Sequence, residues 1–122
     1  MIKRRLKVEI ADNSFKHERG LMFRKKLGED EGMLFSFDSP KKLKFWGVNT
    51  FIPLSIAFVS PENKIVKIDY ISPLSDKTVN SEKECNMAIE ANYDFFSRNK
   101  VQVGDKIKII SEGINSFILF PN

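Results

Sequence analysis

The feature that most constrains the fold is a series of short apolar or alternating runs separated by turn residues. In the first run Leu6, Val8 and Ile10 alternate with charged residues, which is the period of a β-strand with one buried face. Further strands are expected at 33–37, 43–48, 54–59, 65–71, 87–91, 106–110 and 117–120. Short helices are expected at 12–23, where Asp12-Asn13-Ser14 offers N-caps, and at 93–98, capped by Asn92. The pattern predicts a mainly β protein with short helices, folded as a compact β-sandwich or a partly closed β-barrel.

Length and composition indicate a single domain spanning residues 1–122. Of these 122 residues 42% are hydrophobic, which is enough for one closed core, while the chain is too short for two ordinary domains. No repeat or Pro/Gly/Ser-rich linker divides it. No apolar run approaches the roughly 20 residues of a membrane span, and the first ten residues lack the apolar core of a signal peptide. We therefore expect a cytoplasmic protein with no membrane association.

The charge balance gives only weak attraction to polyanions. The formal net charge is +4, and the basic residues cluster at Lys3-Arg4-Arg5, Lys25-Lys26 and Lys41-Lys42-Lys44. A nucleic-acid site would need these clusters on one face with exposed aromatic residues interleaved, whereas each cluster lies beside a predicted turn or a chain end. We expect solvated loops there and no nucleic-acid binding; weak nucleic-acid binding, which would show steep salt dependence, is kept as an alternative.

The turn Ser60-Pro61-Glu62-Asn63-Lys64 predicts a hairpin whose register can be counted. Proline suits the fixed φ of a type I turn, and Asn63 suits the left-handed position of a three-residue loop. Pairing Val59 with Ile65 sets Phe58 opposite Val66, Ile56 opposite Ile68 and Leu54 opposite Tyr70, which makes one face wholly apolar. The other face then carries Ala57 opposite Lys67 and Ser55 opposite Asp69, with the last pair close enough for a hydrogen bond.

The common catalytic and cofactor motifs are absent from the sequence. The single histidine, His17, excludes sites built on two imidazole ligands and is expected to be a solvated helical residue. There is no Gly-x-Gly-x-x-Gly, no phosphate-binding loop and no Gly-x-Ser-x-Gly elbow. The lone Cys85 has no disulfide partner, and the nearby acids Glu82 and Glu84 are expected to raise its pKa. We expect no cofactor and no metal site, and the sequence carries no recognisable catalytic signature.

One stretch, Phe45-Trp46-Gly47-Val48-Asn49-Thr50, places an indole beside an amide and a hydroxyl near the end of a predicted strand. Such a group could recognise a small polar ligand, with the ring supplying contact area and the polar groups supplying orientation. The alternative is a structural role, because a single tryptophan in a small β-protein usually lies in the core and Asn-Thr pairs often satisfy backbone groups. The residues leave both interpretations open.

Four segments form a recognisable ensemble when they are taken in order. They are Arg19-Gly20-Leu21-Met22-Phe23-Arg24, Glu31-Gly32-Met33-Leu34-Phe35, Phe45-Trp46 with Asn49-Thr50, and Ile52-Pro53-Leu54 with Ile56-Ala57-Phe58. In order and spacing they resemble the uncharacterised family called domain of unknown function 192, from about Leu6 to the Val103-Gly104-Asp105 turn. The resemblance implies a compact β-sandwich or barrel with small helices, and it implies no established activity.

This chain departs from the family pattern at three positions. The family usually reads Trp-Met-Lys-Asn-Thr and Pro-Leu-Asp, whereas Gly47, Val48 and Ser55 stand here in place of the methionine, the lysine and the aspartate. A cation and an acid are thus lost together, as the loss of a coupled ion pair would predict. The resemblance therefore gives no support to acid–base chemistry at these positions.

From these residues we predict a non-catalytic binding or accessory module for a small polar ligand or a partner segment. Trp46, Asn49 and Thr50 would form its site. Asp69, opposite Ser55, would replace the missing acid, and Arg24 would contact a carboxylate or a phosphate. The structural alternative for Arg24 is an ion pair with the acidic run 29–31.

The alternative function is a hydrolase-like enzyme with Asp69 or Glu90 as general base. It requires one of these carboxylates to be partly buried beside a cleft, with its pKa raised by desolvation. Alternation along 87–91 turns Glu90 away from Ile89 and Ala91, toward solvent or the mouth of a site, with solvent as the default. Ligand identity and oligomeric state are not predicted.

Overall fold

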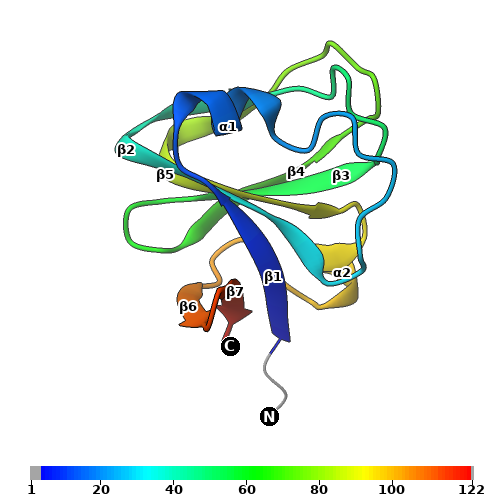
Figure 1. Cartoon of the computed structure of the whole chain (residues 1–122). Helices are drawn as coiled ribbons and strands as arrows, with labels where there is room; N and C mark the ends of the chain where they lie inside the picture. Colours follow the sequence, from blue (N-terminus) through cyan, green and yellow to red (C-terminus); the bar gives the residue numbers. More distant parts are fainter. Residues whose placement is uncertain (1–3, 122) are drawn as a thin grey trace.

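Seven strands and two short helices make up the computed structural model, which describes residues 4–121 (Figure 1). Lys3, the first member of one basic cluster, lies outside the described residues. In chain order the elements are β1 (Arg4–Ala11), α1 (Ser14–Arg19), β2 (Glu31–Phe45), β3 (Leu54–Val59), β4 (Ile65–Ile71), β5 (Val79–Asn92), α2 (Phe95–Arg98), β6 (Lys108–Glu112) and β7 (Asn115–Phe120).

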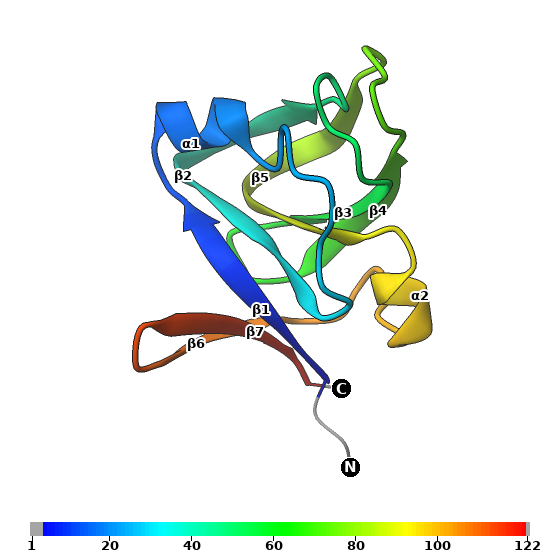
Figure 2. The ribbon, with the colours of Figure 1, turned by 45° about the vertical axis from the view of Figure 1, so that its right-hand side comes forward.

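All seven strands belong to one sheet, in the order β4-β3-β5-β2-β1-β7-β6. Neighbouring strands are antiparallel except for β1 and β2, which are parallel. The sheet bends round on itself to form a half-barrel, with α1 beside the middle of β2 and α2 after β5 (Figure 2). The expectation of a mainly β, partly closed barrel is confirmed.

Two expected strands match the structure residue for residue, and the others differ in extent. The runs 54–59 and 65–71 are β3 and β4. The runs 33–37 and 43–48 form a single long strand, β2, whose pairing with β5 shifts register twice. Helix α1 is shorter than expected because it ends at Gly20, where a φ of 49° stops the helical path. Asn13 is its N-cap and accepts a hydrogen bond from the backbone of Lys16.

The second helix begins later than expected. Asp94 occupies the N-cap position of α2, whereas the expected cap, Asn92, is the last residue of β5. The side-chain amide of Asn92 instead donates to the carbonyl groups of Leu27 and Gly28, at 3.1 and 2.7 Å. Asn92 thus fixes the loop before β2 and does not start the helix.

The buried apolar residues form two clusters on opposite faces of the sheet. On β3, Ala57 and Val59 belong to one cluster, while Ile56 and Phe58 belong to the other, as alternation along a strand requires. The first cluster includes both phenylalanines of α2. The second includes Leu21, just after α1, and Phe35 of β2. The face that carries this second cluster is the one on which the pocket described below opens.

The expected register of the β3–β4 hairpin is wrong beyond its first pair. Val59 pairs with Ile65, and Asn63 has the expected positive φ of 61°. The register then shifts by one, so that Phe58 pairs with Lys67, Ile56 with Asp69 and Ser55 with Tyr70. The pairing of Ser55 with Asp69 does not form. Every residue of β3 is buried, so a shift by one residue exposes no apolar side chain and alternation alone cannot specify the register.

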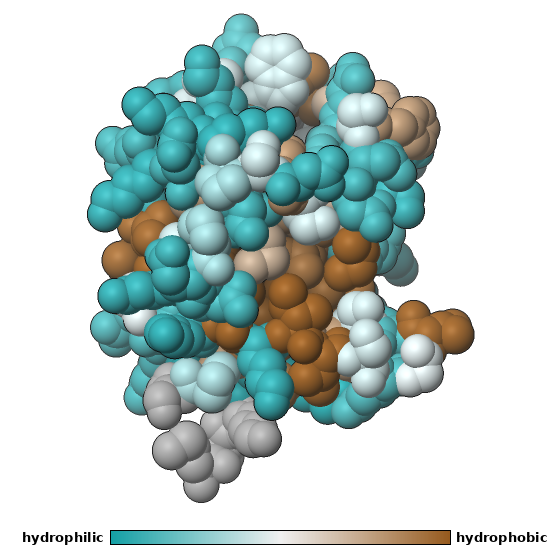
Figure 3. All heavy atoms as spheres, turned by 90° about the vertical axis from the view of Figure 1, so that its left-hand side faces the viewer, coloured by the Kyte–Doolittle hydropathy of each residue, from teal (hydrophilic) through white to brown (hydrophobic). Residues whose placement is uncertain are grey.

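The β6–β7 hairpin stands out from the rest of the sheet. In Figure 3 it projects from the body of the molecule, and hydrophobic surface gathers beside it. Its turn carries Gly113 with a φ of 62° and the fully exposed Ile114. The two edges of the open sheet are β6, in this hairpin, and β4. Among residues 4–121, no helix has the length and apolar character needed to cross a membrane.

Candidate functional site

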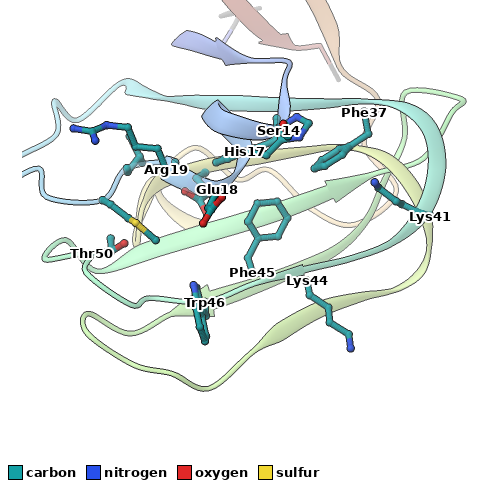
Figure 4. A pocket seen from close by; sticks show the side chains of 15 residues that line it. Ser14, His17, Glu18, Arg19, Phe37, Lys41, Lys44, Phe45, Trp46 and Thr50 are labelled. Carbon is teal, nitrogen blue, oxygen red and sulfur yellow. The ribbon is translucent and has the colours of Figure 1, made fainter.

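A pocket of about 380 Å³ opens between α1 and strand β2 (Figure 4). Helix α1 and the turn after it form one wall, from Ser14 to Met22. Strand β2 and the loop that follows it form the other wall, and β5 contributes Glu90. In this turn Leu21 is buried, and a methyl group added to Gly20 would lie 3.4 Å from the ring of Phe35. A pocket of this size fits a small organic molecule.

Glu90 is the buried carboxylic acid among the residues that line this pocket. Alternation along β5 points Ile89 and Ala91 into the opposite cluster, so Glu90 faces the pocket. Its exposed fraction is 4%, and no hydrogen bond or ion pair reaches its carboxyl group from residues 4–121. Burial without a partner raises the pKa of Glu90 to about 8. The expectation that Glu90 faces solvent is wrong, and the alternative condition, a buried carboxylate beside a cleft, is met.

Aromatic rings line the pocket around this carboxyl group. They belong to Phe35, Phe37, Phe45 and Trp46. The rings of Phe35 and Phe45 meet edge to face with their centroids 4.9 Å apart. The imidazole of His17 stacks on Phe37 at 4.0 Å, and its Nε2 lies 2.7 Å from the carbonyl oxygen of Ser36. His17 is therefore half-buried in the pocket wall, which corrects the expectation of a solvated helical histidine.

Charged side chains surround the mouth of the pocket and are exposed. Arg19, Lys41 and Lys44 provide three cations and Glu18 provides one acid. The ammonium nitrogen of Lys41 lies 5.0 Å from the centroid of Phe37, and the guanidinium carbon of Arg19 lies 5.8 Å from that of Phe23. Within residues 4–121 none of these three cations forms an ion pair. In Figure 4 the charged ends of Arg19 and Lys44 point away from the middle of the pocket.

The expected site residues Trp46 and Thr50 both line this pocket, in different ways. The indole of Trp46 is 48% exposed and also borders a neighbouring groove formed with Phe15, Phe23 and Asn49. Thr50 is buried, and its hydroxyl donates to the carbonyl of Val48 at 3.3 Å. The ring is thus accessible to a ligand, while the hydroxyl is engaged with the main chain.

Asn49 borders the groove and has a backbone role. Its φ is 58°, and its carbonyl accepts a hydrogen bond of 2.8 Å from the backbone of Phe23. Asparagine and glycine tolerate this left-handed conformation better than other residues do. The side-chain amide forms no hydrogen bond within residues 4–121 and is available to a ligand.

The two roles of Asn49 can be separated by substitution. We expect Asn49→Ala to lower the free energy of unfolding by about 1 kcal/mol, and Asn49→Gly to change it by less than about 0.5 kcal/mol. Urea denaturation followed by circular dichroism measures both values. Equal losses in the two variants would contradict the backbone role and assign the stabilisation to the amide.

The other three expected site residues lie elsewhere. The hydroxyl of Ser55 is buried and donates to the carbonyl of Asn92 at 2.8 Å. Asp69 is paired with Lys67 at 3.6 Å, so it does not replace an acid at Ser55. Arg24 makes a two-pronged contact with Glu9, which also lowers the pKa of Glu9. The expected ionic partner of Arg24, the run 29–31, is thus replaced by an acid on β1.

No cluster of potential metal ligands occurs among residues 4–121. Cys85 is buried and free. Burial raises the pKa of its thiol, so the expected direction is right, although desolvation and not the neighbouring acids is the cause. The chemistry of the site therefore lies with the carboxyl group of Glu90, the aromatic walls and the cations at the mouth.

The fold is a small half-barrel with a ligand-sized pocket beside a short helix. Residues 2–109 match DUF192, a family described as uncharacterised. The chain belongs to this family.

Two solved structures share the fold. A protein of Sinorhizobium meliloti 1021, described as a candidate transcription regulator, is 28% identical with a TM-score of 0.80, over 86% of this chain and 92% of that one. A protein of unknown function from Novosphingobium aromaticivorans DSM 12444 is 32% identical with a TM-score of 0.80, over 83% and 73% of the two chains. No curated protein sequence matches this chain.

Proposed function

We propose that this protein is a non-catalytic binding module for a small polar ligand that also carries an apolar group. The observation behind the proposal is the buried carboxyl group of Glu90, which has no partner within residues 4–121 and lines an aromatic-walled pocket. Burying a polar group without a hydrogen bond costs free energy, and polar groups in protein interiors are nearly always paired. A bound ligand would provide the missing partner.

The proposed site modifies the expected one. Trp46 stays at the mouth, where its exposed ring can stack on the ligand, and Asn49 borders the adjoining groove. Glu90 takes the place of Asp69 as the acid. The size of the pocket favours a small molecule over a partner segment. We infer that the protein acts in the cytoplasm, in keeping with the free and buried Cys85.

The proposal is tested by a thermal-shift screen of small ring-containing compounds in cationic, neutral and anionic form. A ligand of the native state raises the midpoint of unfolding. Because the chain has one tryptophan, fluorescence reports directly on Trp46. We expect a true ligand to change this fluorescence and to lose at least about tenfold in affinity in Glu90→Gln.

The matched control is Glu84→Gln, the same substitution on the same strand at an exposed position. Glu84 does not line the pocket, so this variant should bind as the wild type does. Compounds that bind Glu90→Gln and wild type equally well would place the binding site elsewhere. If none of the screened compounds binds at millimolar concentration, the proposal is contradicted.

A second candidate function is supported by the titration of Glu90. A carboxyl group with a pKa near 8 can accept or donate a proton at neutral pH, as a general base or acid must. Catalysis predicts that a compound bound in the pocket is converted, with a rate that depends on Glu90. Recovery of every bound compound unchanged after prolonged incubation would contradict it.

A further inference from the structure

The pocket combines one buried carboxyl group with several aromatic rings. The carboxyl group belongs to Glu90, and Phe35, Phe45 and Trp46 line the same cavity. Ring faces carry partial negative charge and attract cations, most strongly where water is excluded. An ionised carboxylate attracts the same type of group by its charge, and it forms charge-assisted hydrogen bonds with any N–H that the group carries. Two independent features of the pocket thus favour a positively charged group.

We propose that the ligand is an organic ammonium compound, whose cationic group pairs with the carboxylate of Glu90 and whose apolar part packs against Phe45 and Trp46. This inference rests on the proposed function, because it names the charge of the ligand at that same site. This pairing would offset the free-energy cost of burying the carboxylate of Glu90, since buried charges in proteins are normally paired with a group of opposite charge. The aromatic walls already hold a cation at their edge, where Lys41 lies over Phe37.

Other ligand charges fit the inner pocket less well. An anion would meet the ionised carboxylate as a like charge, or would require Glu90 to remain protonated. A neutral hydroxyl could hydrogen-bond to Glu90 in either state, although more weakly than a cation bonds to the carboxylate.

The cations at the mouth do not oppose this assignment strongly. Arg19, Lys41 and Lys44 are exposed, so their charges act through water and salt. The charged ends of Arg19 and Lys44 point away from the middle of the pocket (Figure 4). Glu90 is 4% exposed, and its interaction with a bound cation is screened far less. The buried carboxylate therefore dominates the interaction with a group that enters fully.

Cation binding would be linked to the release of a proton. Without ligand, burial holds the pKa of Glu90 near 8, and a paired cation stabilises the ionised form. The other charged or titratable groups that line the pocket are His17, Glu18 and Arg19 from α1 and Lys41 and Lys44 from β2. The neighbouring strand β3 carries no titratable side chain. Affinity for a permanent cation should therefore rise about tenfold per pH unit up to pH 8 and then level off.

The test uses three probes that share one ring and differ in charge: benzyltrimethylammonium, benzyl alcohol and benzoate. Each is titrated against the intact protein at pH 6, 7, 8 and 9, with Trp46 fluorescence as the readout and calorimetry as the check. The first probe carries its charge at every pH, so the protein alone determines the pH dependence. We expect the cation to bind at least tenfold more tightly than the alcohol at pH 8. Glu90→Gln should abolish the rise with pH and reduce the preference to the part that the aromatic rings supply, whereas Glu84→Gln should keep both in full.

The outcomes separate this inference from the proposed function. Equal or tighter binding of the alcohol or benzoate, sensitive to Glu90→Gln, would overturn the charge assignment and leave the binding pocket intact. Failure of all three probes to bind, while other compounds bind in a Glu90-dependent way, would also overturn the charge assignment alone. A cation preference that persists unchanged in Glu90→Gln would assign the attraction to the aromatic walls and overturn the role of Glu90. Circular dichroism of Glu90→Gln confirms that the variant is folded.

Discussion

The free energy of unfolding of the wild-type protein is expected to fall by about 4 kcal/mol, relative to that of Glu90→Gln, as the pH rises from 4.5 to 8. The folded state holds the pKa of Glu90 near 8, and the ordinary value is 4.5. At a pH between these two pKa values, Glu90 is ionised in the unfolded chain and protonated in the folded chain. Stability therefore decreases with rising pH in this interval, and the decrease levels off above pH 8.

Glu90→Gln has nearly the same shape without the ionisation, so its stability should not follow this decline. Urea denaturation at pH 4.5, 6, 7, 8 and 9 gives the difference between the two curves, in which other titrating groups cancel. Glu9, paired with Arg24, acts at lower pH because its pKa is lowered. Glu84→Gln should follow the wild type throughout. Parallel curves for wild type and Glu90→Gln would contradict the buried state of Glu90.

A carboxyl group that costs this much stability at neutral pH makes no hydrogen bond within residues 4–121. Proteins commonly retain destabilising groups at positions where activity requires them. A bound cation would remove the cost, because the ionised state would then be paired. The same residue should therefore show opposite effects: Glu90→Gln stabilises the free protein at high pH and weakens its binding of the cationic probe.

The hairpin and the strands around it show how far local pattern determines this fold. The turn at Pro61-Glu62-Asn63 and the apolar runs on either side of it predict β3 and β4 to the residue. The register failed because β3 is buried on both faces, so no polar face marks the correct pairing. The two halves of β2 were expected as separate strands, because the polar stretch 38–42 between them has the composition of a loop.

The pocket was only partly predictable. Trp46 was found from the sequence, because its ring stands out beside polar neighbours. Glu90 carries a signal of its own, an acid within the otherwise apolar run 87–91, and that signal indicates a buried carboxyl group once both faces of β5 are known to be covered. The meeting of α1 with β2, which brings His17 to Phe37, depends on long-range packing that local pattern does not specify. Local pattern likewise does not specify the ion pair between Arg24, in the loop after α1, and Glu9 of β1.

Gly47→Ala is expected to lower the free energy of unfolding by about 3 kcal/mol, and the midpoint of thermal unfolding by roughly 10 °C. A methyl group at residue 47 would lie 2.1 Å from the carbonyl oxygen of Ser72, which is a backbone atom with little freedom to move. The backbone of Gly47 also donates to Ser75 at 2.9 Å, and Leu74 donates to Thr50 at 2.9 Å. Separating the two loops would break both hydrogen bonds and displace Trp46. This close contact leaves no room for a side chain at residue 47, where the family pattern has a methionine.

Gly28→Ala is the matched control for this effect. Its added methyl group would lie 2.6 Å from the side-chain oxygen of Glu31, which is the flexible end of a side chain and can rotate away. We expect Gly28→Ala to change the free energy of unfolding by less than about 1 kcal/mol. Because the loop of Gly47 carries Trp46, Gly47→Ala should also weaken the binding of a pocket ligand at temperatures where the variant is folded. If both glycine variants have the same stability, the contact with Ser72 does not constrain residue 47, and the loops at 47–50 and 72–75 are free to separate.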